Sequence, residues 1–276
     1  MTQPNIYNEY FHHFKAISWQ IEADIRFWKH FLDFSIDRYK KENPINRKIL
    51  ESGFSIYNWN HIKDTAWLAS SNETLSKEII DLDAHGKEFF HWIMNLSIVR
   101  VYNSLELLLL RAVKEKYFPN LSDPLSGKKE TDAVIAAVKT ALKNQQLKVD
   151  TKNNRYLIAF LITTNAETKK FYGNSINNAG FKTNWINFFE FFSILRNVIA
   201  HHSMIIETDV LNNIKSIAAD VFSHYFDDQN SKNTAIVLKP KSEDYFLNFL
   251  NHINDFAGNT LKFLADEKNL NFIGLY

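Results

Sequence analysis

Apolar residues recur at intervals of three and four over most of this chain, which is the spacing of residues on one face of an α-helix. One such stretch covers residues 5–41. A second begins at about Thr74, with a break expected at Gly86, and stops before Pro119. A third covers residues 184–205, which contain no Gly or Pro. The pattern therefore predicts a mostly α-helical protein.

Shorter elements are expected between and after these stretches. The alternation of Phe54 and Ile56 with polar residues predicts a short strand, and residues 62–69 are expected to form a short helix. The remaining predicted elements are helices over 133–142, 156–162, 204–226 and from Ser242 to about residue 266, with a short β-like run over 234–238.

The expected fold class is all-α, with at most a minor short β element. We predict a helical bundle with extra N-terminal helices and a basic helical insertion. Its parts are an N-terminal helical extension over residues 1–73 and a helical domain over residues 74–276 that contains the insertion at 119–182.

Charge is distributed unevenly along the chain. Residues 111–182 contain thirteen Lys and Arg against six Asp and Glu, a net charge of +7, whereas the whole chain of 276 residues carries +1. A run of charge most often only keeps a surface soluble. A local basic surface also attracts a phosphate backbone, and this one leads directly into the helix predicted over 184–205.

Composition excludes several classes of protein. The chain has no Cys, which excludes disulfides, thiolate catalysis and Cys-based zinc sites. No uninterrupted apolar run approaches the roughly 18 residues that span a bilayer, and the N-terminus lacks the features of a signal peptide. Phosphate-binding loops, dinucleotide fingerprints and nucleophile elbows are absent from the sequence. We therefore predict a cytoplasmic protein with no cofactor and no membrane association.

A polar stripe runs along the otherwise apolar helix predicted over 184–205. At 100° per residue, four polar side chains fall within roughly 80° of arc. They are Glu190, Ser193, Asn197 and His201. Polar groups on such an apolar helix are costly unless they face water or find hydrogen-bond partners. The stripe is therefore the candidate functional surface.

Three neighbouring residues complete the candidate site. Arg196 lies about 100° from Asn197, but its side chain is long enough to reach the stripe. His202 falls beside the apolar side of the helix, so His201 is the better candidate for chemistry. Glu106, on the long helix that precedes Pro119, can face the stripe, or it is simply a solvated residue at the edge of the core.

The run RNVIAH at Arg196–His201 resembles the Arg-x4–6-His motif of the HEPN superfamily. Members of this superfamily are small all-α domains, and many are metal-independent endoribonucleases. The long helix before Pro119, with its YNSLELLLL portion, resembles the helix that packs against the motif helix in that family. The resemblance covers residues 85–226.

This resemblance implies cleavage of RNA by attack of the 2′-hydroxyl on the adjacent phosphate, which leaves a 2′,3′-cyclic phosphate. The implied catalytic residues are Arg196, Asn197 and His201. A histidine is suited to proton transfer near neutral pH, and an arginine offers a planar set of donors to phosphate oxygens. Asn197 precedes His201 by one helical turn, so it can orient the imidazole or contact the phosphate.

The resemblance also implies partners. It implies a homodimer in which two motifs meet across a cleft, and a toxin or antiviral-defence role with an antitoxin or defence partner. Position 203 is Ser, where toxins of the HEPN–nucleotidyltransferase pairs carry Tyr two residues after the motif His. Regulation by modification of that Tyr is therefore not expected here.

Two alternatives stay open. The same motif suits a HEPN-like module that binds a partner without catalysis. A third reading is a ferritin-like di-iron carboxylate protein, because Glu9–His12 and Glu88–His91 are both Glu-x-x-His runs. Only eight residues precede Glu9, which leaves no room for the Glu-bearing helix that such folds place first. Asp81, His85 and Glu88 share a helical face and can bind a metal, although charges in a first helical turn also suit the helix dipole.

Overall fold

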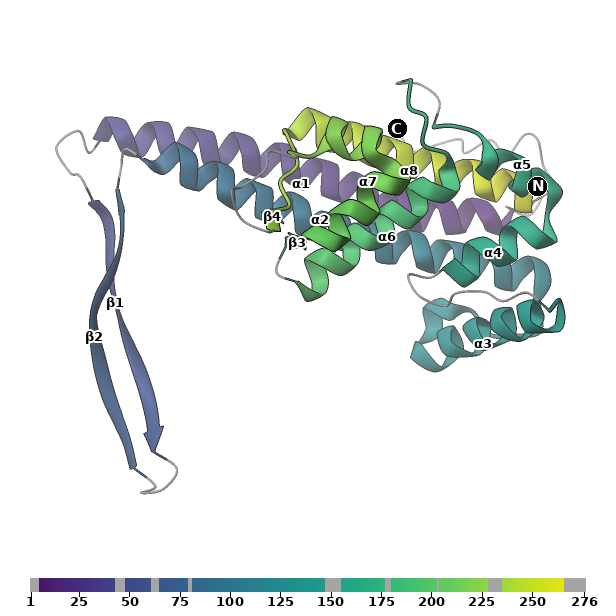
Figure 1. Cartoon of the computed structure of the whole chain (residues 1–276), viewed down its shortest axis with the longest axis horizontal. Helices are drawn as coiled ribbons and strands as arrows, with labels where there is room; N and C mark the ends of the chain where they lie inside the picture. The colour runs from purple at the N-terminus through teal and green to yellow at the C-terminus, as the bar shows by residue number, and fades with distance from the viewer. Residues whose placement is uncertain are drawn as a thin grey trace. The chain divides into compact units, whose positions relative to one another are not determined.

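The computed structural model describes residues 5–42, 48–60, 65–78, 81–146, 155–176, 180–202, 204–227 and 235–265. Helices predominate among the elements drawn in Figure 1, so the prediction of a mostly α-helical fold is confirmed. In chain order the elements are α1 (Ile6–Glu42), β1 (Lys48–Asn60), β2 (Thr65–Glu78), α2 (Leu82–Tyr117), the 3-10 turn η2 (Pro124–Ser126), α3 (Lys128–Asn144), α4 (Arg155–Thr164), α5 (Ala166–Gly173), α6 (Trp185–His201), β3 (Ile205–Glu207), α7 (Thr208–Tyr225), β4 (Ala235–Val237) and α8 (Glu243–Leu264).

The chain forms two compact units. The larger unit joins Met1–Ile25 to Ile93–Tyr276, and the smaller one is Arg26–Trp92, so α1 and α2 each continue from one unit into the other. This division differs from the predicted boundary after residue 73. The first half of α1 belongs to the larger unit because its apolar face, including Phe14 and Ile21, is buried.

The smaller unit contains a long hairpin, visible in Figure 1 as a twisted two-stranded ribbon. β1 and β2 pair antiparallel, with Tyr57 opposite Leu68. The short strand expected around residues 54–56 is therefore part of a much longer one. The helix predicted over 62–69 is wrong for the described residues 65–69, and the following helix begins at Leu82 rather than Thr74. Pairing with β1 selects the extended backbone here, and a local pattern does not record such pairing.

Gly86 does not interrupt α2, so the predicted break is wrong. A Cβ atom placed at Gly86 would lie 2.7 Å from Cδ1 of Ile36 on α1. The glycine thus allows α1 and α2 to approach closely within the smaller unit, while the helix continues through it.

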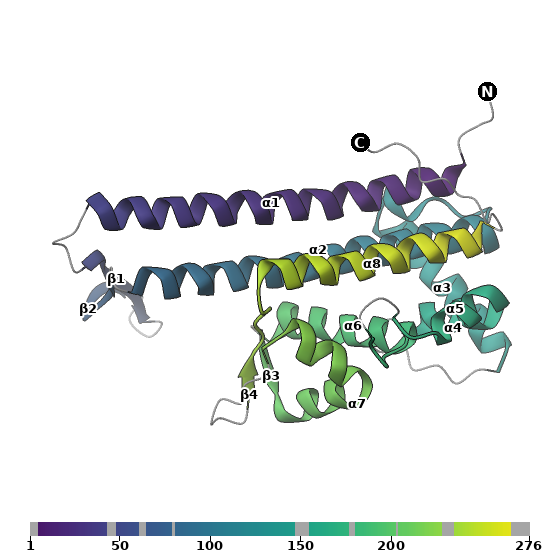
Figure 2. The same cartoon turned by 90° about the horizontal axis from the view of Figure 1, so that it is seen from above.

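The larger unit is a series of helices packed in succession, as Figures 1 and 2 show. α3 packs on η2 and α4, α4 on α5, α5 on α6 and α8, α6 on α7, and α7 on α8. The helices predicted over 133–142 and 156–162 are present as α3 and α4. The run predicted as β-like over 234–238 contains β4, which pairs antiparallel with β3. The side chain of Ser242 caps α8, as predicted from the sequence.

α2 is the one helix in the described part of the chain that is long and apolar enough to cross a membrane by length and composition. Of its most apolar window, 56% is buried in the structure. The core helix of a folded protein has the same character.

The core of the larger unit is rich in aromatic side chains and includes the buried His252. Phe188, Phe249 and Phe256 are each at most 2% exposed, and the ring of Phe188 contacts that of His252. The Nε2 atom of His252 lies 2.7 Å from the hydroxyl oxygen of Tyr225. Burial, with a smaller effect from His224, lowers the pKa of His252 to about 4. His252 is therefore neutral in the folded protein at neutral pH.

This histidine makes stability depend on pH. The ordinary pKa of the group is 6.5, so between pH 6.5 and 4 the unfolded chain binds a proton that the folded chain does not. Its contribution to the free energy of unfolding is present above pH 6.5 and is lost as the pH falls toward 4, by up to about 3 kcal/mol. His252→Gln retains an amide for Tyr225 and does not titrate. Urea unfolding at pH 7 and pH 5 is expected to show a smaller loss for the variant than for the wild type, and equal losses would contradict this role.

Candidate functional site

The motif helix α6 begins and ends at defined caps. The side chain of Asn184 accepts a hydrogen bond of 2.9 Å from the N–H of Asn187 at its start. His201 is its last residue, and His202 has left helical geometry, with φ −121° and ψ 23°. Met204 then adopts a left-handed conformation with φ 66°. The helix predicted over 184–205 is therefore shorter than expected, because a turn leads from it into β3.

The N-terminal half of the polar stripe is bound to neighbouring helices. Glu190 forms an ion pair with Arg155 of α4. Ser193 is buried and accepts a hydrogen bond of 3.2 Å from the Tyr102 hydroxyl on α2. These two side chains join α6 to α4 and α2. Their role in this structure is therefore to hold the helices together.

The C-terminal half of the stripe is partly open to solvent. Arg196 and Asn197 are half-buried, and Nη1 of Arg196 donates to Oδ1 of Asn197 over 3.0 Å. The Nε of Arg196 is buried without a hydrogen-bond partner in the described part of the chain. The two side chains therefore form one polar unit in the open half of the stripe.

Glu106 of α2 interacts with this unit. Burial raises the pKa of its carboxyl group, and the positive charge of Arg196 partly opposes that shift. The pKa of Tyr156 on α4 is raised by burial first and then by the negative charge of Glu106. The carboxyl of Glu106 therefore lies within electrostatic range of the Arg196 guanidinium.

The two histidines at the end of α6 are both exposed. His201 follows Arg196 by about 7.5 Å along the helix axis and by roughly 140° around it. Within the described residues, no hydrogen bond connects the two side chains. His202 was predicted to fall beside the apolar side of the helix. That prediction is wrong, because His202 has left helical geometry. Asn197 lies one turn before His201 on the same face, so an anion beside Asn197 can be approached by the guanidinium and by the imidazole.

The sequence did not indicate that α3 and α4 reach this site through specific side chains. Arg155 pairs with Glu190, and Tyr156 lies near Glu106 while its ring is 5.0 Å from Nζ of Lys139 on α3. The sequence signal that pointed to this segment was the excess of Lys and Arg over residues 111–182. The partners of individual residues that lie on different helices depend on how the helices pack.

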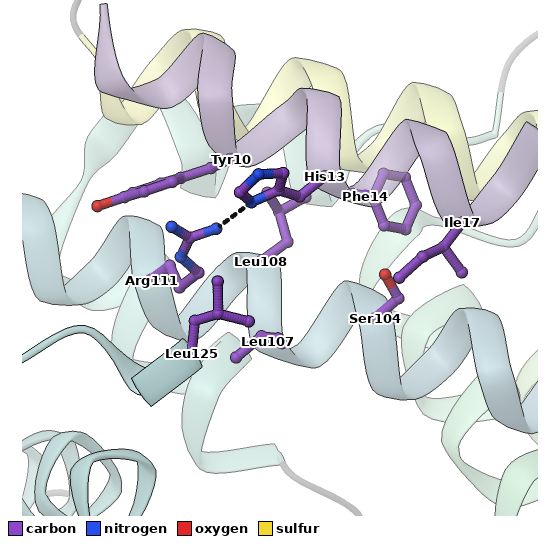
Figure 3. A pocket seen from close by; sticks show the side chains of 9 residues that line it. All are labelled: Tyr10, His13, Phe14, Ile17, Ser104, Leu107, Leu108, Arg111 and Leu125. Atoms are coloured by element: carbon purple, nitrogen blue, oxygen red, sulfur yellow. Dashed lines mark hydrogen bonds between the residues drawn. The ribbon is translucent and has the colours of Figure 1, made fainter. Parts of the chain in front are cut away.

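A hollow lies between α1 and α2 (Figure 3). Its volume is about 290 Å³. At its polar end the buried Arg111 donates to Asp123 over 2.7–3.0 Å and to Nδ1 of His13 over 2.8 Å, beneath the ring of Tyr10 at 4.0 Å. The rest of the lining is apolar except for Ser104. Because the guanidinium is satisfied by these partners, the cluster serves to hold α1, α2 and η2 together.

In the structure, the glutamate of each Glu-x-x-His run lies near a different side chain. Glu9 lies 3.5 Å from Nη2 of Arg111. Glu88 lies 3.6 Å from Nδ1 of His85. Within the residues that the structure describes, no group of three or more His, Asp or Glu side chains is placed to hold a metal ion.

Comparison of the chain with protein-family models, with curated proteins and with solved structures found no match. The resemblance to HEPN domains therefore rests on the residues of the motif helix and of the long helix α2.

Proposed function

We propose that this protein is a metal-independent endoribonuclease of the HEPN type, acting in a toxin or defence setting. The observation that carries the proposal is the polar end of α6. There Arg196 is bonded to Asn197, and the exposed His201 lies one turn further on the face of Asn197. This end of the helix is open to solvent, whereas the other half of the stripe is bound to α2 and α4.

Each residue has a role in the proposed reaction. The imidazole of His201 takes the proton of the 2′-hydroxyl, and the oxygen attacks the adjacent phosphorus. The P–O5′ bond breaks, and the 5′-oxygen leaves with a proton supplied by the imidazolium or by water. Arg196 donates to the phosphate oxygens as negative charge develops on them. The products are a 2′,3′-cyclic phosphate and a 5′-hydroxyl.

The surroundings of Arg196 support this arrangement. Asn197 holds one edge of the guanidinium, and the carboxyl of Glu106 on α2 lies within electrostatic range of its charge. A group that is oriented before the substrate arrives loses less entropy in the reaction. Exposed lysines of α3 at positions 128, 129, 139 and 143 supply positive charge in the same unit for the RNA backbone.

The proposal is tested with purified wild-type protein and total RNA. We expect cleavage that is unchanged by EDTA and fragments that end in 2′,3′-cyclic phosphate, because neither step uses a metal ion. End-group analysis by mass spectrometry distinguishes this product from a 3′-hydroxyl. Cleavage that stops in EDTA, or fragments with 3′-hydroxyl ends, would contradict the proposal.

A second candidate is a HEPN-like module that binds RNA or a protein partner without cleaving. The observation in its favour is that Arg196 already donates a hydrogen bond to Asn197 and lies within electrostatic range of Glu106, so the motif can serve packing alone. Retarded migration of RNA with protein, without new fragments under any condition, would favour this candidate.

A further inference from the structure

The distal half of α1, in the smaller unit, exposes a row of aromatic side chains. Phe27 is 60% exposed, Trp28 46%, Phe31 51% and Phe34 57%. Phe27, Phe31 and Phe34 lie within roughly 60° of arc on the helix. We refer to these four residues as the α1 aromatic face.

The rings of this face contact one another and leave their outer surfaces open. Phe27 and Phe31 are stacked with centroids 6.2 Å apart, and Trp28 meets them edge-on at 5.3 Å and 5.8 Å. At about 200 Å² per aromatic side chain, four that are half exposed present roughly 400 Å² to water. A contiguous apolar patch of this size is comparable to the largest one on a typical monomer, which is often functional, and a stable interface covers about 800 Å² per partner. The face thus has the size of the apolar centre of such an interface.

Charge indicates what kind of partner covers it. On and beside this stretch Lys29 pairs with Asp33, Arg38 with Glu42 and Lys40 with Asp83. These basic groups are therefore compensated by carboxylates of the same unit. An anionic membrane or a nucleic acid requires free positive charge around the aromatic residues. This aromatic row is instead nearly neutral and has charges of both signs at its edges. The same surface on a second copy of the chain is therefore complementary to it.

We propose that the α1 aromatic face pairs with the same face of a second copy of this chain. The two helices run antiparallel and cross near His30 and Phe31, so Phe27 of one copy packs on Phe34 of the other. A twofold interface presents the same patch from both copies, and antiparallel helices also bring opposite dipole ends together. The interface lies within residues 26–92 and does not depend on the proposed RNA cleavage.

Light scattering coupled to size exclusion, over a series of protein concentrations, tests the pairing. We expect the wild type to reach twice the mass of one chain. Phe31→Glu is expected to raise the dissociation constant of the dimer at least about 100-fold, because it places a charge in the centre of a desolvated interface. Leu125→Glu is the matched control, since Leu125 on η2 is 53% exposed and lies outside the face. It is expected to dimerise as the wild type does.

Circular dichroism checks that each variant keeps its helices, and Phe34→Ser provides a milder change at the edge of the face. A wild type that remains monomeric, or a Phe31→Glu variant that dimerises unchanged, overturns the proposal. Sedimentation of the monomer with anionic vesicles, abolished by Phe31→Glu, would assign the face to a membrane instead and would also overturn it.

The antiparallel orientation of the two α1 helices is tested separately by cross-linking. The chain has no Cys, so an introduced cysteine is its single thiol. In antiparallel helices that cross near residue 30, position 30 lies beside its own copy, whereas position 41 lies roughly 30 Å from its copy. A short bis-maleimide is therefore expected to cross-link His30→Cys and not Lys41→Cys. Equal cross-linking of both variants overturns the antiparallel arrangement.

Discussion

His201→Ala is expected to lower the rate of RNA cleavage at least about 100-fold, which is the smallest effect usual for removal of a general base. The imidazole of His201 lies at the open end of α6 on the face of Asn197, and imidazole is the side chain suited to taking the 2′-hydroxyl proton. His201 is exposed and makes no hydrogen bond in the described part of the chain, so its removal should leave the fold unchanged. Single-turnover cleavage of a defined RNA, with circular dichroism as the check on folding, measures the effect.

His202→Ala is the matched control for this variant. His202 is also exposed and is the next residue in the chain, but it has left the helix that carries the motif. Its removal is expected to change the rate less than about threefold, well below the effect of a catalytic group. A His201→Ala protein that cleaves at the wild-type rate would remove the basis of the ribonuclease assignment and would leave the non-catalytic module as the better account.

Asp123→Ala is expected to lower the free energy of unfolding by about 3 kcal/mol, since it leaves the buried Arg111 without its main carboxylate. Burial pushes the pKa of Asp123 upward, but hydrogen bonds from Arg111 and from the N–H of Leu125 outweigh it and hold the pKa below its usual range. Asp123 thus anchors η2 to α2. Urea unfolding at pH 7 measures the loss.

Two further proteins show whether the effect comes from the buried cation. Asp33→Ala removes an equivalent carboxylate from an exposed pair with Lys29 and is expected to cost no more than about 0.5 kcal/mol. Arg111→Met combined with Asp123→Ala removes the charge together with its partner and should recover much of the stability. A double variant as unstable as Asp123→Ala alone would show that the lost contact, rather than the unpaired guanidinium, causes the effect.

Particular residues show where sequence reasoning succeeded and where it failed. The face of α6 was predictable because helical periodicity alone places Glu190, Ser193, Asn197 and His201 on one side. Their different surroundings were not predictable. Glu190 and Ser193 meet Arg155 and Tyr102, which come from other helices, whereas His201 lies at the helix end and meets solvent.

Backbone predictions failed where a distant segment decides the conformation. Residues 65–69 carry no strong strand pattern, and their extended state follows from pairing with β1. Gly86 was expected to break a helix, but the nearby side chain of Ile36 explains a glycine within a continuous one. Glycine serves both purposes, and the chain near Gly86 contains nothing that distinguishes them.

By itself, the sequence determined that the chain is mostly helical, where α1, α3, α4, α6 and α8 lie, and which residues of α6 share a polar face. These properties depend on interactions within a few residues, so local periodicity, caps and prolines are sufficient. Only the tertiary structure decided which half of that face is bound and which is open, and that Glu106 lies by Arg196. It also decided that Arg111 is buried in a charged cluster and that the aromatic residues of distal α1 face solvent. These depend on contacts between segments far apart in the chain, and the pattern of any one segment contains no record of them.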